Sequence, residues 1–194
     1  MVMAPGASPV KPRSIGGIDG KNVYTVRNVA DIVHLKDGLE AAGAENTAVI
    51  GGGFIGIEVA ENLAKAGKKV TVVEAMNQIL APFDYDMVQM LHKELLDNGV
   101  SLIVEDGVKT IEEKQITLAS GKTVPADAVI LAIGVAPETG LAKAAGLEIG
   151  ETGGILVDHN YRTSDKNIYA VGDAIEVFDR MTGNHHVWLL PVRP

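Results

Sequence analysis

The sequence of 194 residues contains no cysteine. Disulfides, thiolate catalysis and cysteine-ligated metal sites are therefore excluded for these residues. No apolar run approaches the roughly 20 residues that a membrane helix needs, and the first residues lack the charged and apolar segments of a signal peptide. We therefore expect no membrane partner and a cytoplasmic location.

Basic residues are scarce relative to acidic ones. The chain has 17 Lys and Arg against 25 Asp and Glu, a net charge of −8, and no basic stripe, which argues against a nucleic-acid partner. Metal ligands are also sparse. Of five histidines only His185 and His186 are close in sequence, and neighbours in a strand point to opposite faces. We expect no metal site.

Glycine, in contrast, marks a dinucleotide-binding motif. An apolar run ending at Ile50 predicts a buried strand, and Gly51-x-Gly53-x-x-Gly56 follows it directly. In this fingerprint the first glycine permits the strand-to-helix turn, the second lets the backbone approach a pyrophosphate, and the third lets the helix pack on the strand. The N-terminus of the helix then offers free N–H groups to the anion.

Glu74 predicts which dinucleotide is bound. It ends the next apolar run, about 20 residues after the glycines, where an acid binds the ribose hydroxyls. A carboxylate there repels a 2′-phosphate by roughly 4 kcal/mol at about 4 Å and an effective dielectric near 20, of which screening leaves about 1–2 kcal/mol. From Ala75 to Pro82 no Lys or Arg offsets this repulsion. We expect NADH to be preferred over NADPH by about tenfold or more.

The order of predicted elements indicates an α/β fold. Alternating strands and helices predict a Rossmann-like parallel sheet with helices on both faces. Short pieces between 107 and 124 predict an antiparallel β meander, and the Pro- and Gly-rich residues 1–23 predict an irregular, mostly extended arm. The expected helices are 28–42, one from the glycine loop to about 66, 84–97 and 141–145, and the expected strands of the sheet are 47–50, 69–74, 100–104 and 128–133.

Two other nucleotide motifs fail on inspection. Gly121-Lys122-Thr123 resembles the end of a P-loop, but position 116 holds isoleucine in place of the required glycine. We expect a hairpin turn there. No tyrosine is followed four residues later by lysine, so the Tyr-x-x-x-Lys pair of short-chain dehydrogenases is absent.

Two further segments complete a family pattern. Ile133-Gly134 ends the most apolar strand, and Thr163-Ser164-x-x-x-Ile168-Tyr169-Ala170-x-Gly172-Asp173-Ala174 follows later in the chain. Together with the glycine motif and Glu74, in this order, they resemble the pyridine nucleotide-disulfide oxidoreductases. The resemblance is strongest to the branch of NADH oxidases, NADH peroxidases and coenzyme A-disulfide reductases, and it covers nearly the whole chain.

The resemblance implies a division into domains. In that family an NAD(P)H domain is inserted into an FAD domain, and a dimerisation domain follows. Residues 24–137 would be the NAD(H)-binding domain, and 1–23 with 138–194 a discontinuous fragment of the FAD-binding domain. The family's first glycine fingerprint, its redox-active cysteine and its dimerisation domain have no counterpart here. We therefore expect the missing FAD and dimerisation domains of the same polypeptide as partners, a homodimer for the full-length protein, and no catalytic residue in this chain.

The resemblance also implies roles for individual residues on the NADH side. Phe54 matches an aromatic residue that stacks over the flavin and gives way to the nicotinamide. Glu58 matches an acid that pairs with a flavin-side lysine and approaches the nicotinamide amide, and Gly134 would lie beside the nicotinamide. The remaining NADH contacts would come from the pyrophosphate and ribose groups Gly51, Gly53, Phe54, Ile55, Gly56 and Glu74.

On the FAD side the implied residues are Gly172 and Asp173, of which Asp173 would bond a ribityl hydroxyl in the full-length protein. One departure from the family is the segment Gly134-Val135-Ala136-Pro137, where relatives usually carry an arginine before the proline. This departure weakens the case for inter-domain contacts at that segment.

The function implied is the NADH-binding portion of an FAD-dependent oxidoreductase. In such an enzyme hydride passes from NADH to the flavin and on to a cysteine-based centre, a disulfide, peroxide or oxygen, while the protein orients the cofactors. Without a cysteine or an FAD pyrophosphate loop, we expect the isolated chain to be inactive and not to retain FAD. The alternative is a non-catalytic nucleotide-binding or sensing module of the same fold. Glu58 and the Asp173 segment favour the enzyme, because a sensor needs neither.

Overall fold

The computed structural model describes residues 1–179, 181 and 183–187. The chain forms two compact units, one of residues 1–8 and 135–194 and the other of residues 9–134. Positions 180, 182 and 188–194 of the predicted FAD-domain fragment lie outside the described residues.

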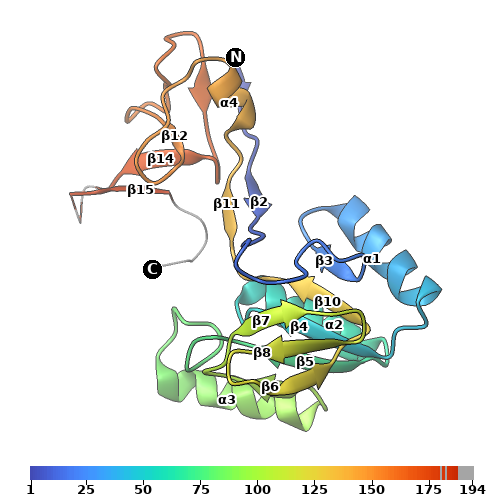
Figure 1. The fold of residues 1–194 in the computed structure, drawn as a ribbon. Coiled ribbons are helices and arrows are strands. Elements are labelled where there is room, and N and C mark those ends of the chain that lie inside the picture. The colour runs from blue at the N-terminus through green and yellow to red at the C-terminus, as the bar shows by residue number, and fades with distance from the viewer. Residues whose placement is uncertain (180, 182, 188–194) are drawn as a thin grey trace. The chain divides into compact units, whose positions relative to one another are not determined.

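A parallel five-stranded sheet forms the centre of the 9–134 unit (Figure 1). Its order is β3-β10-β4-β5-β6, and every neighbouring pair is parallel. The mixed α/β class with a parallel sheet is thus confirmed. The edge strand β3 was not predicted, because three residues are too few to show a period. The strands are β3 (Val23–Thr25), β4 (Asn46–Ile50), β5 (Lys69–Val73), β6 (Ser101–Ile103) and β10 (Ala128–Leu131).

Three helices accompany this sheet, close to their predicted bounds: α1 (Val29–Ala41), α2 (Phe54–Lys65) and α3 (Tyr85–Asp97). Helix α1 is closed by a capping box. The side chain of Asn28 accepts from the Asp31 N–H at 3.1 Å, and the Asp31 carboxylate accepts from the Asn28 N–H at 3.2 Å. Two orphan donors of the first turn are thereby satisfied.

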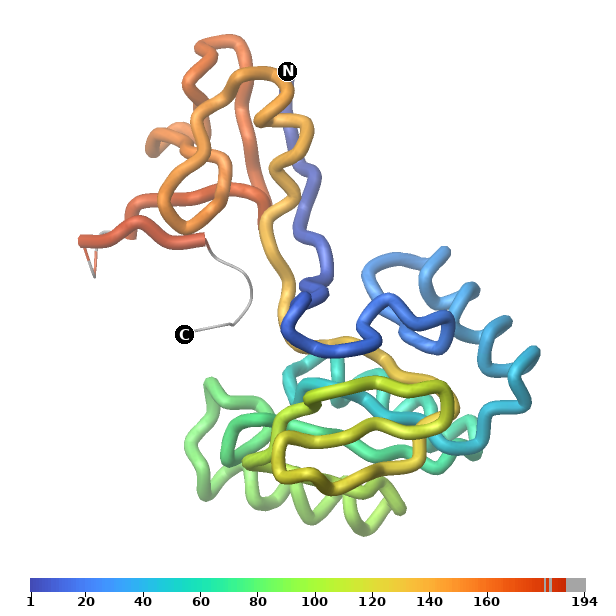
Figure 2. The backbone as a smooth tube through the Cα atoms, viewed as in Figure 1, coloured from blue at the N-terminus to red at the C-terminus, as the bar shows by residue number. Residues whose placement is uncertain are grey.

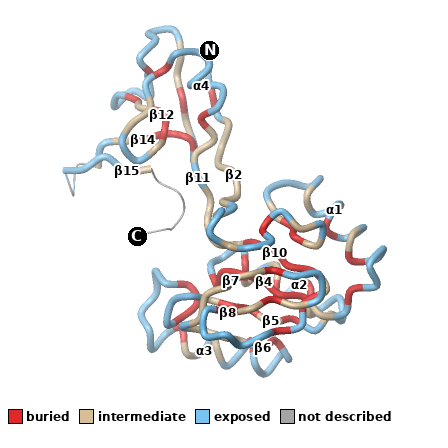
Figure 3. The backbone as a smooth tube through the Cα atoms, viewed as in Figure 1, coloured by how far each residue is buried: buried red, intermediate tan, exposed pale blue. Residues whose placement is uncertain are grey.

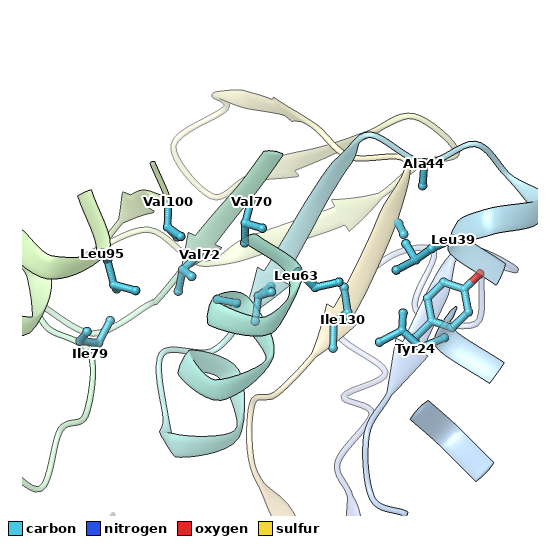
Figure 4. Packing of buried hydrophobic residues seen from close by; sticks show 14 of the residues in the cluster. Tyr24, Leu39, Ala44, Leu63, Val70, Val72, Ile79, Leu95, Val100 and Ile130 are labelled. Carbon is cyan, nitrogen blue, oxygen red and sulfur yellow. The ribbon is translucent and has the colours of Figure 1, made fainter. Parts of the chain in front are cut away.

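The three helices share one face of the sheet. Strand side chains alternate, so Val70 and Val72 of β5 point to the helices. Figure 4 shows Val72 beside Leu95 of α3, with Leu63 of α2 next along the sheet, while Leu39 of α1 lies beside Tyr24 of β3 in the same cluster. Figure 3 shows that buried backbone is concentrated in the central strands.

The meander covers the opposite face. It consists of antiparallel strands β7 (Val108–Ile111), β8 (Gln115–Leu118) and β9 (Thr123–Pro125), and Figure 2 shows it in front of the sheet. The predicted meander is confirmed, but the expected helices on both faces are not found. Ile116 and Leu118 of β8 share one buried cluster with Ile50 and Val129 of the sheet, so the meander takes the place of a second helical layer.

The compact units begin and end at different residues from the predicted domains 24–137, 1–23 and 138–194. Residues 9–23 belong to the unit of the sheet. The Gly16 N–H donates to the Lys109 C=O at 3.0 Å, and the Gly16 C=O accepts from the Ile111 N–H at 2.7 Å. Ile18 is also buried, in the core beneath the meander. The arm is therefore attached to β7, and residues 135–137 belong to the other unit.

In the unit of residues 1–8 and 135–194, the described residues form short paired strands and one short helix. Strand β1 pairs in parallel with β13, β2 pairs with β11, and β12, β14 and β15 form a three-stranded sheet. Met3, Ile155 and Ala170 belong to its core. The elements are β1 (Val2–Met3), β2 (Ala7–Pro9), β11 (Val135–Pro137), α4 (Gly140–Ala144), β12 (Ile155–Leu156), β13 (Tyr169–Ala170), β14 (Ile175–Phe178) and β15 (His185–Val187). Of the helices that the structure describes, none has the length and hydropathy of a membrane crossing.

The carboxylate of Asp127 joins the starts of β4 and β10 to the meander. It accepts from the N–H groups of Asn46 at 2.9 Å and Glu45 at 3.1 Å, and Lys114 Nζ lies 3.2 Å away. The hydrogen bond from the Asn46 backbone, helped by Lys114 and opposed by burial, lowers the pKa of Asp127 from 3.8 to about 2. A lowered pKa stabilises the fold above the unfolded value near 3.9, and this stabilisation is lost as pH falls toward 2.

Asp127→Asn should therefore lower the free energy of unfolding by about 1–2 kcal/mol at neutral pH. The difference from the wild type should shrink between about pH 4 and pH 2, measured by urea unfolding. Asp97→Asn, which removes an exposed carboxylate paired with Lys93, is the control and should change stability by less than about 0.5 kcal/mol. Equal stability of Asp127→Asn and wild type at neutral pH would contradict this role.

Candidate functional site

The predicted NADH residues of the sheet unit gather at one edge of the parallel sheet. The glycine loop follows β4, Glu74 follows β5, and Gly134 comes three residues after β10. Ile50 pairs with Val73 on one side and with Leu131 on the other. The carboxyl ends of three adjacent strands therefore meet, which is where open α/β sheets bind their ligands.

The three glycines of the fingerprint differ in what surrounds them. Gly51 has φ +103°, and a Cβ there would lie 2.4 Å from the Ala132 C=O. A Cβ on Gly56 would lie 2.0 Å from the Gly51 C=O. At both positions the protein's own backbone leaves no room for a side chain. Gly53 is exposed, and a Cβ there would meet nothing within 4 Å, so the open side of the loop is at Gly53.

The N-terminus of α2 presents unused hydrogen-bond donors at this open side. Gly53 is the N-cap and provides no side-chain acceptor. The first helical bond runs from the Ile57 N–H to the Gly53 C=O at 3.0 Å, and no described residue accepts from the N–H groups of Gly53, Phe54 or Ile55. Helix α1, by contrast, is closed by Asn28. Free donors at the positive end of the helix dipole suit an anion such as a pyrophosphate.

Glu74 lies directly against the glycine loop. Its Oε2 accepts from the Gly52 N–H at 2.7 Å and its Oε1 from the Met76 N–H at 2.8 Å. The side chain is half-buried, and a carboxylate has about four lone-pair positions, so further donors can be accepted. Sequence reasoning did not single out Gly52, because the fingerprint leaves its position unspecified.

Phe54 and Glu58 occupy one exposed face of α2. They are four residues apart, which places them on neighbouring turns. The Phe54 ring is 43% exposed and lies against Phe83, with ring centroids 6.0 Å apart. Ile55 is 42% exposed. Phe83 was not anticipated, since nothing in its local sequence links it to a residue of the glycine loop.

The remaining predicted residues lie at turns. Gly134 has φ +121° and is the last residue of the sheet unit. Gly172, with φ +81°, and Asp173 are exposed in the other unit, between β13 and β14. A predicted hairpin turn is found at Gly121, with φ +87°, between β8 and β9. Among the described residues no three potential ligand side chains gather as a metal ion would require.

The family model described as pyridine nucleotide-disulphide oxidoreductase matches residues 1–187. The NAD(P)H coenzyme A polysulfide/persulfide reductase of Pyrococcus horikoshii is 38% identical over 200 residues, which is 100% of this chain and 44% of that protein.

Two solved structures are also similar to this chain. The reduced Bacillus anthracis CoADR-RHD is 44% identical with a TM-score of 0.89, over 96% of this chain and 34% of that one. An NAD-dependent persulfide reductase from A. fulgidus is 39% identical with a TM-score of 0.89, over 96% of this chain and 35% of that one.

The chain thus spans less than half the length of the relatives that it matches. These relatives are oxidoreductases, and their family uses NAD(P)H and FAD. The resemblance seen in the sequence is confirmed. The chain belongs to the pyridine nucleotide-disulphide oxidoreductase family.

Proposed function

We propose that the unit of residues 9–134 binds NADH, as the nicotinamide-nucleotide portion of an FAD-dependent oxidoreductase. The observation that carries the proposal is the N-terminus of α2, where the N–H groups of Gly53, Phe54 and Ile55 have no acceptor among the described residues. Beside them Gly53 leaves room for a ligand. Donors and space coincide at the carboxyl edge of the sheet, so the residues present fit a pyrophosphate.

Glu74 would accept hydrogen bonds from the adenosine ribose. Its carboxylate is held at the loop by the Gly52 and Met76 N–H groups, so its charge is fixed where a 2′-phosphate would have to lie. The repulsion argued above then favours NADH over NADPH by about tenfold or more. The name of the A. fulgidus relative, an NAD-dependent enzyme, supports this preference, whereas that of the P. horikoshii relative covers both nucleotides.

The nicotinamide half would lie toward Phe54, Glu58 and Gly134. When bound, the nicotinamide supplies a hydride and the flavin of the whole enzyme receives it. In this chain Phe54 would shield the site and Glu58 would orient the nicotinamide amide. Both side chains are exposed on one face of α2, which suits contact with a cofactor and favours this function over a sensing module.

The other unit would be part of an FAD-binding domain. Asp173 is exposed beside Gly172, so its carboxylate fits a ribityl hydroxyl. The sequence holds one Gly-x-Gly-x-x-Gly fingerprint, at residues 51–56, and the NADH proposal uses it, so no second such loop is left for the FAD pyrophosphate. We therefore propose that residues 1–194 alone do not retain FAD. The names of two relatives, a polysulfide/persulfide reductase and a persulfide reductase, suit a sulfur compound as acceptor in the whole enzyme, with a cysteine from outside this sequence. A homodimeric whole enzyme and a cytoplasmic location remain predictions.

Calorimetric titration of the chain with NADH and then with NADPH tests the proposal. We expect one NADH site, and binding of NADPH that is weaker by about tenfold or more. An absence of NADH binding, or tighter binding of NADPH, would overturn the proposal.

A further inference from the structure

The segment between β5 and α3, residues 75–84, is folded onto the glycine loop. The Leu80 N–H donates to the Gly52 C=O at 2.8 Å. The Ile79 side chain is fully buried, and a Cβ on Gly52 would lie 2.5 Å from its Cγ2. The Gly52 N–H donates to Glu74, the residue directly before the segment. Both backbone polar groups of Gly52 are therefore hydrogen-bonded, the C=O to the segment and the N–H to Glu74.

His92 of α3 holds this segment. The Ile79 N–H donates to His92 Nε2 at 3.3 Å. Since a backbone N–H can only donate, Nε2 is unprotonated and the proton of the neutral ring is assigned to Nδ1. Leu80 adopts φ +47°, a strained conformation for a residue with a side chain, which persists only where its surroundings hold it. The His92 acceptor is one such restraint.

The neutral ring is favoured by burial. Burial lowers the pKa of His92 from its usual 6.5, with no charged neighbour among the causes. The charged groups on α2, on α3, on the segment 75–84 and its neighbours, and after β6 are bonded to other groups or exposed. Glu74 accepts from backbone N–H groups, Glu61 pairs with Lys65, and Lys93 pairs with Asp97. Besides these five residues, the charged groups there are Glu58 of α2, Asp84 at the end of the segment, Asp86 and Glu94 of α3, and Glu105 and Asp106 after β6.

We propose that His92 is a positioning residue that makes NADH affinity depend on pH. Its neutral ring holds Ile79, and through Ile79 the Gly52 backbone, in the arrangement that binds the pyrophosphate. Protonation turns Nε2 into a donor facing another donor, so the bond is lost and the segment is released from the loop. This inference rests on the proposed NADH function.

The test compares the wild type with His92→Gln and His92→Leu. Glutamine can place an acceptor near Nε2 and does not titrate, whereas leucine removes the acceptor. The probe is ADP-ribose, which carries the adenosine and pyrophosphate groups and is stable in acid. We expect wild-type affinity to fall about fivefold between about pH 8 and pH 5, and His92→Gln affinity to stay constant. His92→Leu should bind about fivefold more weakly at both pH values.

A second readout needs no ligand. Hydrogen exchange of the Ile79 amide at neutral pH should be slow in the wild type and His92→Gln and faster in His92→Leu. Equal exchange in the three proteins, or equal pH dependence of ADP-ribose binding in the wild type and His92→Gln, would overturn the proposed role of His92. Either result would leave the proposed NADH function standing. No binding of ADP-ribose by the wild type at about pH 8 would overturn the proposed function and, with it, this link to affinity.

Discussion

Gly53→Val should abolish most NADH binding while the protein stays folded. A Cβ at Gly53 would meet nothing within 4 Å, and the residue has φ −75°, so valine fits the ligand-free backbone. Its methyl groups would fill the space that the pyrophosphate needs beside the Phe54 and Ile55 N–H groups. Losing two hydrogen bonds to a charged group, at about 1.5–3 kcal/mol each, predicts at least a hundredfold weaker affinity. Calorimetry measures this loss.

The control for this substitution is Thr139→Val. Thr139 is also an N-cap without a side-chain hydrogen bond to its helix, in this case α4 of the other unit. Each valine should lower the free energy of unfolding by about 1 kcal/mol or less, measured by thermal unfolding, and only Gly53→Val should lose NADH. Affinity of Gly53→Val within threefold of the wild type would mean that no phosphate approaches this glycine.

Glu74→Gln should remove most of the discrimination between NADH and NADPH. The amide has nearly the shape of the carboxylate but no charge, so the repulsion of a 2′-phosphate disappears. We expect the ratio of the NADPH to the NADH dissociation constant to fall about tenfold. NADH affinity should fall several-fold as well, because one end of the amide is a donor and cannot accept from both the Gly52 and the Met76 N–H groups.

A control for net charge is Glu40→Gln, at an exposed acid of α1. It removes the same charge at an exposed position outside the glycine loop and should leave the ratio of dissociation constants unchanged. If Glu74→Gln kept the wild-type ratio while still binding NADH, the carboxylate would not be the group that excludes NADPH.

Elements of the fold could be predicted from the sequence where a local pattern of residues determines the structure. β5 and α2 follow from apolar periodicity, and the turn at Gly121 from its composition. The layer order could not be predicted in the same way. Whether a helix or the meander covers the second face depends on a buried cluster that brings together residues distant in the chain, such as Ile50 and Ile116.

The candidate site shows the same division. Gly51, Gly53, Gly56 and Glu74 could be singled out because their spacing follows the dinucleotide fingerprint. Gly52, Phe83 and His92 could not, because what links each to the site is a contact that exists only after folding: a hydrogen bond to Glu74, a ring contact with Phe54 and an acceptor for Ile79.

The NADH titration, followed through the backbone amide resonances of the ¹⁵N-labelled chain, tests the central claim most directly. The largest shifts should fall on the amides of Gly53, Phe54 and Ile55, whose N–H groups have no acceptor among the described residues. Smaller shifts are expected at Gly52 and Met76, which are bonded to Glu74. Saturable binding with its largest shifts elsewhere, or no shift at the N-terminus of α2, would contradict the claim that this helix holds the pyrophosphate of NADH.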